Sequence, residues 1–209
     1  MSVVQIYLQA HVHHGLLEIV DEDRIRAHSV TISDALGQRD PTKLVKQVTL
    51  TGSAAAALKF VLIRVKNKKN KMGLHMKVHD LPLVRVVAIY QAVELLRIRP
   101  VQPHIEGHIT GHVSHNLVTP EEMIAVHRVF ESRRETSKVW RTMVHQLGWY
   151  IANDRVSDED RDALEKAAQA LPSLHGEILS KGKELLEKRT VKERLGKVDG
   201  GWREKKKSG

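Results

Sequence analysis

The stretch Leu81–Ile98, LPLVRVVAIYQAVELLRI, is the most apolar segment of the chain and indicates a buried helix. Pro100 ends this pattern, because a proline ring cannot continue a helix. The stretch Ala54–Val65 repeats the apolar spacing of three and four residues, and Ser53 before it is a suitable N-cap. The two stretches together predict a pair of helices packed in the core of one domain.

The N-terminal part of the chain is richer in β-forming residues. Val3–Leu8, Leu16–Val20 and Val48–Leu50 predict short strands, and Asp21–Asp23 between them predicts a turn. Ile25–Ile32 combines strand-like alternation with the start of a helix. The order therefore predicts a small sheet that precedes the buried helix pair.

The remaining sequence predicts only helices. Thr119-Pro120-Glu121-Glu122 gives the clearest helix start, because Thr119 can cap, Pro120 suits the first helical position and Glu122 can complete a capping box. Further helices are predicted over His104–His115, over Ser137–Ile151 and after Ser157. Beyond Pro172 the apolar residues form only a thin stripe, which is typical of an amphipathic helix.

These patterns predict an α/β fold, with a small sheet of short N-terminal strands packed with helices, a helical C-terminal half and a charged helical tail. Three parts are expected: a core over residues 1–116, a helical extension over 117–165, and a charged amphipathic helix with a flexible basic end over 166–209.

Composition excludes several classes of protein. The chain has 209 residues and no cysteine, which excludes a disulfide framework, a thiol nucleophile and cysteine-ligated metal sites. Neither a secretory signal nor a membrane-spanning stretch is recognisable. We expect an intracellular protein of the nucleus or cytoplasm, without contact to a membrane.

Positive charge is concentrated at the C-terminal end. The formal net charge is +9, and Lys181–Gly209 carries eleven Lys or Arg against five Asp or Glu. A second group of lysines lies between Lys66 and Lys77. A basic nucleic-acid-associated protein is therefore an alternative function. Its contacts would come from Lys66, Lys68, Lys69, Lys71, Lys77, Lys205, Lys206 and Lys207.

Several segments resemble the BTB/POZ family, especially its divergent fungal type. Ile25–Ser33 is similar to the segment that follows the family's first strand pair, and Val48–Leu50 with the helical stretch after it is similar to the next strand and helix. Leu83–Ile105 resembles the family's paired helices through Ile89, Tyr90, Ala92, Leu95 and Ile98, and Leu117–Tyr150 resembles the fungal C-terminal extension. The resemblance covers roughly residues 1–165.

This resemblance implies a non-enzymatic protein-protein interaction module. Such a module associates with a second copy or with other proteins as an adaptor, so homo- or hetero-oligomers are expected. Because a short apolar edge strand is a natural template for pairing, the first strand and the helix near Val30 are the expected interface. The interface residues predicted on this basis are Val3, Val4, Ile6, Leu8, Val30, Ile32 and Leu36.

No residue pattern indicates catalysis. The chain has no nucleotide-binding glycine loop and no Gly-x-Ser-x-Gly motif, so no cofactor and no small-molecule substrate are expected. His104, His108 and His112 recur at four-residue spacing, which would allow two of them to chelate zinc. No His-Glu-x-x-His arrangement supplies a base, and we interpret these histidines as an exposed polar face rather than a metal site.

Overall fold

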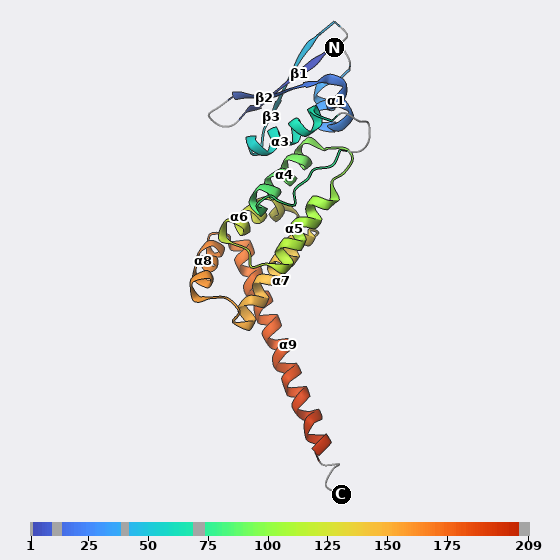
Figure 1. Ribbon diagram of the computed structural model, residues 1–209. Helices are drawn as coiled ribbons and strands as arrows, with labels where there is room; N and C mark the ends of the chain where they lie inside the picture. The colour runs from blue at the N-terminus through green and yellow to red at the C-terminus, as the bar shows by residue number, and fades with distance from the viewer. Residues whose placement is uncertain (1, 10–13, 39–41, 69–73, 205–209) are drawn as a thin grey trace. The chain divides into compact units, whose positions relative to one another are not determined.

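The computed structural model describes residues 2–9, 14–38, 42–68 and 74–204, with side chains up to residue 192 in the last helix. The chain divides into two compact units, Met1–His112 (unit 1) and Val113–Gly209 (unit 2). Unit 1 contains a small sheet with helices, and unit 2 is helical over its described residues, so the α/β class predicted from the sequence holds in outline (Figure 1).

The sheet of unit 1 has three strands. β1 (Val3–Gln9) lies between β2 (His14–Asp21) and β3 (Val45–Leu50). β1 and β2 form an antiparallel pair, whereas β1 and β3 run parallel. Parallel strands need a crossover, and the chain makes it through α1 (Glu22–His28) and α2 (Val30–Leu36).

Two local expectations from the sequence are wrong in this region. β1 is the central strand and not an edge strand, because β3 pairs with the side that β2 leaves open. Residues 21–23 do not form a turn between strands: the carboxylate of Asp21 accepts a hydrogen bond from the backbone N–H of Arg24 at 3.1 Å and caps α1. An acidic residue is favoured at this position, because it satisfies free N–H groups of the first turn.

The predicted pair of buried helices is present. α3 (Ala55–Lys66) and α4 (Leu83–Leu96) pack on each other, and α4 buries eight of its residues. The N-cap of α3 is Ala54, so Ser53 does not cap the helix as predicted. α5 (Pro103–His115) follows and crosses the boundary between the units.

An extended segment, residues 74–79, packs within unit 1. Its residues alternate between buried and exposed, and Leu74, Met76 and Val78 point into the core. The buried amide of Gln102 holds the segment: its oxygen accepts from the Met76 N–H at 3.2 Å, and its nitrogen donates to the Leu74 carbonyl at 2.6 Å. One side chain therefore satisfies backbone groups that a neighbouring strand would otherwise bind.

Unit 2 is built from helices whose starts follow the sequence closely. They are α6 (Pro120–Phe130), the short 3-10 helix η1 (Glu131–Arg133), α7 (Lys138–Asn153), α8 (Asp158–Gln169) and α9 (Pro172–Glu204). The Thr119–Glu122 capping box is complete, with hydrogen bonds of 3.3 and 3.0 Å. Ser137 and Ser157, where the sequence predicted two helices to begin, are the N-caps of α7 and α8.

α7 and α9 make the main contact of unit 2. They approach closely at Gly148 and Gly182, where a Cβ added to Gly148 would lie 3.0 Å from the Gly182 nitrogen. Trp140 on α7 is buried, and its indole N–H donates to the carboxylate of Glu177 on α9 at 2.7 Å. α7 lies in the part expected over residues 117–165 and α9 in the part expected over 166–209, and both helices belong to unit 2.

Candidate functional site

One face of the sheet in unit 1 is left open by the described helices. The residues of β3 alternate between exposed and buried, and its pairing with β1 places the exposed members next to each other. We call this surface the open face; it is formed by Val3, Gln5, Tyr7, Leu16, Ile19, Val45, Gln47 and Thr49. None of these eight side chains carries a formal charge, and the pairing of β1 with β2 places one carboxylate, that of Asp21, beside Val3 at the end of this face.

Apolar residues lie at both edges of the open face. On β2, Leu16 is 51% exposed and Ile19 is 38% exposed; on β3, Val45 is 53% exposed. At its centre, the Gln5 side-chain oxygen accepts hydrogen bonds from the Tyr7 hydroxyl at 3.0 Å and the Gln47 amide at 3.1 Å. These bonds hold the side chains of Gln5, Tyr7 and Gln47 in place. A partner that covered them would remove neutral polar groups from water, which costs less than removing charged ones.

The opposite face of the sheet belongs to the core. It contains Val4, Ile6 and Val48, and it also contains a buried ion pair in which Lys46 Nζ lies 2.9 Å from a Glu22 carboxylate oxygen. Hydrogen bonds from Lys46 and then from Arg26 lower the pKa of Glu22 to about 2. The carboxylate is therefore ionised inside unit 1 and stabilises the contact between α1 and β3.

The interface residues predicted from the sequence divide between these two faces. Val4, Ile6 and Ile32 are fully buried in the core, so they cannot contact a partner while unit 1 is folded. Val3, Leu8, Val30 and Leu36 are half-buried. Sequence reasoning missed the contribution of β2 and β3, although the exposed Val45 could have been found from the alternation over Val45–Leu50.

The basic residues predicted to contact nucleic acid are only partly within the described chain. Lys66 forms an ion pair with Glu18 at 2.7 Å, and the Lys77 side chain is exposed. Lys68 is half-buried. Lys69, Lys71, Lys205, Lys206 and Lys207 lie outside the described residues. The structure therefore places three of these eight lysines.

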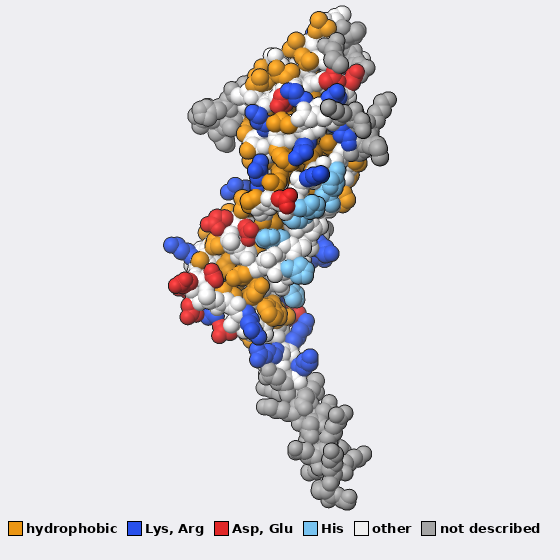
Figure 2. Space-filling view, in the orientation of Figure 1, with side chains coloured by type: hydrophobic (Ala, Val, Ile, Leu, Met, Phe, Trp, Pro, Cys, Tyr) orange, Lys and Arg blue, Asp and Glu red, His pale blue; other side chains and the backbone are white. Residues whose placement is uncertain are grey.

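Histidines gather on one side of unit 1 (pale blue in Figure 2). The ring of His75 stacks on that of His104 with 4.1 Å between centroids, and His79 meets His108 edge-on at 5.7 Å. His104 also bonds to the Met76 carbonyl at 2.8 Å through Nε2. These contacts align the exposed side of the extended segment with α5, a juxtaposition that the spacing along α5 alone did not predict.

The histidine rings influence one another's protonation. The neighbouring His104 is the main cause that lowers the pKa of His75, and burial followed by His79 lowers the pKa of His108. Within the described residues, no group of three or more His, Cys, Asp or Glu side chains has the arrangement to hold a metal ion. The zinc alternative for His104, His108 and His112 therefore receives no support from their geometry.

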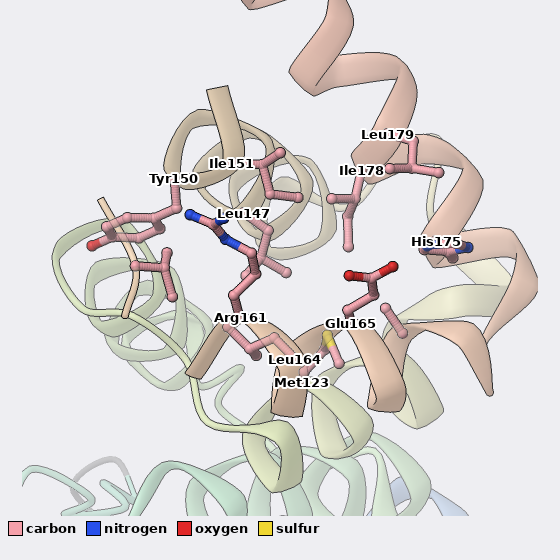
Figure 3. A pocket seen from close by; sticks show the side chains of 12 residues that line it. Met123, Leu147, Tyr150, Ile151, Arg161, Leu164, Glu165, His175, Ile178 and Leu179 are labelled. Carbon is pink, nitrogen blue, oxygen red and sulfur yellow. The ribbon is translucent and has the colours of Figure 1, made fainter. Parts of the chain in front are cut away.

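An apolar pocket of about 140 Å³ lies within unit 2 (Figure 3). α7 contributes Leu147 and Ile151, and α9 contributes Ile178 and Leu179. α8 contributes Leu164, Arg161 and Glu165; the remaining lining residues are Met123, Tyr150, Val156, Ala168 and His175. A cavity of this size and character accommodates a single apolar group about as large as an aromatic ring.

Comparisons with protein-family models, curated proteins and solved structures give no match to this chain. Among the described helices, none combines the length and the apolar character needed to cross a membrane. The candidate surfaces therefore have to be interpreted from their own chemistry.

Proposed function

We propose that this chain is a non-enzymatic protein-protein interaction module, BTB/POZ-like in the arrangement of unit 1, that pairs with a second copy or bridges partners. The observation that carries the proposal is the open face, a surface of mainly uncharged residues with Leu16, Ile19 and Val45 exposed on the outer strands. Burying such residues against a partner is favourable at about 25 cal/mol per Å² of apolar area.

The order of elements in unit 1 supports the family resemblance. A strand pair is followed by two short helices, then by a strand and the packed helices α3 and α4. This is the succession that the similarity of Ile25–Ser33, Val48–Leu50 and Leu83–Ile105 implies. Because one fold can serve many functions, the proposed function depends on the chemistry of the open face and not on the fold alone.

Self-association is the form of the proposal that the open face favours. A surface with little formal charge meets a second copy of itself with little like-charge repulsion, and the Gln5–Gln47 pair offers amide groups that can bond to the same pair across a two-fold axis. The solution mass of the full chain should then be at least twice the 23.7 kDa of one chain.

The test is light scattering during size exclusion on the full chain and on the Val45→Glu variant. Val45 is more than half exposed, so the substitution leaves the fold intact while it places a charge in the proposed interface. Val101→Glu is the matched control, because Val101 is 77% exposed in unit 1 and does not belong to the open face.

We expect the same solution mass, at least that of a dimer, for the unmodified chain and for Val101→Glu, and a lower mass for Val45→Glu. Equal masses for all three chains would contradict pairing through the open face. Deleting β1 is not a suitable test, since its loss would remove the central strand and unfold the sheet.

A further inference from the structure

We propose that the pocket of unit 2 takes the Leu186 side chain of a second copy, as part of an antiparallel pairing between two α9 helices. This pairing is separate from the proposed pairing of unit 1, because it uses the pocket and α9 of unit 2 and not the open face.

The mouth of the pocket continues into an apolar strip along α9. Ile151 is 46% exposed and Leu179 is 51% exposed, although both line the pocket. Leu186 is 46% exposed and lies seven residues after Leu179, so both leucines occupy the same face of the helix. Three large apolar side chains are thus grouped on one side of unit 2, where no described element covers them.

The spacing of the two leucines is self-complementary. In an antiparallel pair of identical helices, a two-fold axis near Gly182 and Lys183 places Leu186 of each chain opposite Leu179 of the other. Leu179 lines the mouth of the pocket, and the pocket has room for one side chain of this size. Each Leu186 would therefore enter the pocket of the other copy.

Charge also favours this occupant. α8 beside the pocket carries Asp158, Glu159, Asp160, Asp162 and Glu165 against only Arg161 and Lys166. The described part of α9 beyond Gly182 has the opposite balance, with Lys183, Lys188, Arg189 and Lys192 against Glu184 and Glu187. Arg161 is itself paired with Asp154, so the remaining charge of α8 is mainly negative. A basic helix is attracted to such a surface.

The test uses disulfide formation between single-cysteine variants, which is clean because the natural chain has no cysteine. Leu186→Cys protein is mixed with Leu179→Cys protein under mild oxidation, both in the full chain. Cα atoms of paired cysteines must come within about 7 Å, so a bond reports direct apposition. Carrying both changes in the Val45→Glu background makes the result independent of the open face of unit 1.

We expect the mixture of Leu186→Cys and Leu179→Cys to form the disulfide-linked dimer at least tenfold faster than the control mixture. The control is Leu186→Cys with Val191→Cys, since Val191 is 55% exposed on the same helix but lies on a different face. Equal rates in the two mixtures, or a faster self-dimer of Leu186→Cys alone, would overturn the antiparallel arrangement.

Two cysteines can lie close together and still fail to form a disulfide, so the self-association of Leu186 variants is measured as well. In the same Val45→Glu background, Leu186→Asp should weaken self-association by tenfold or more, because it places a carboxylate in an apolar pocket beside the acidic helix α8. Leu186→Met, which preserves the apolar character, should leave the dimer largely intact. Monomers throughout, with no disulfide in any mixture, would exclude the second copy as the occupant.

Discussion

The close contact between α7 and α9 predicts opposite effects on stability when alanine replaces Gly148 or Gly182. A Cβ on Gly148 would lie 3.0 Å from the Gly182 nitrogen and 3.0 Å from the Lys181 Cβ, so the helices would have to move apart. A Cβ on Gly182 would meet its nearest atom, the Gly148 carbonyl oxygen, at 3.5 Å, which is an ordinary van der Waals contact.

The magnitudes follow from two terms. Replacing a helical glycine by alanine stabilises by about 0.5–1 kcal/mol, because the unfolded chain loses freedom. Forcing an extra methyl group into a packed contact costs about 1–3 kcal/mol. We therefore expect Gly148→Ala to lower the free energy of unfolding by about 1–2 kcal/mol, and Gly182→Ala to raise it by about 0.5 kcal/mol or more.

Urea denaturation followed by tryptophan fluorescence measures this difference selectively. Trp140 and Trp149 lie on α7, so their emission reports on the unit that contains both glycines. Gly176→Ala in α9 is the reference, because no atom lies within 4 Å of the added Cβ and this glycine belongs to the same unit. If Gly148→Ala were as stable as Gly182→Ala, the close approach of α7 and α9 would be refuted.

Three further predictions concern other interactions. Lys46→Met should destabilise unit 1 by roughly 2–3 kcal/mol in chemical denaturation, because the buried Glu22 keeps Arg26 but loses Lys46 as a charged partner. The pKa of Glu22 is about 2 in the folded chain. The stability that Glu22 contributes above pH 4.5 should therefore be lost as the pH falls toward 2. The histidine contacts should make unit 1 less stable below pH 6.5, because folding lowers the pKa of His75 and of His108 and the unfolded chain therefore binds more protons. Circular dichroism melts at about pH 7.5 and about pH 5.5 measure this loss. The difference between the two melting temperatures should be smaller for the double variant His75→Gln/His108→Gln than for the unmodified chain. Thr119→Ala should cost about 1 kcal/mol by removing the cap of α6, whereas Thr119→Ser should cost less than half of this in the same melts.

Local patterns in the sequence determined the helices and their starts. The Thr119–Glu122 capping box, the caps at Ser137 and Ser157 and the apolar run of α4 all depend on residues within a few positions of one another. The physical reason is that capping hydrogen bonds and helical periodicity are local interactions, which the chain carries in its order. The coarse α/β class followed from the same local signals.

Long-range pairing decided the remaining features. β1 was expected at the edge of a sheet and lies at its centre, because the choice of partner for a strand depends on segments about 40 residues away. The apposition of His75 with His104 and the meeting of Gly148 with Gly182 likewise join residues that no local pattern connects.

The candidate surfaces illustrate the same division. Sequence alternation showed that the strands have an apolar and a mixed face, but only tertiary packing decided which face the helices cover. It buried Val4 and Ile6 and left Val45 exposed. The sequence determines the chemistry of each side chain, whereas the burial of that side chain depends on the packing of elements that are distant along the chain.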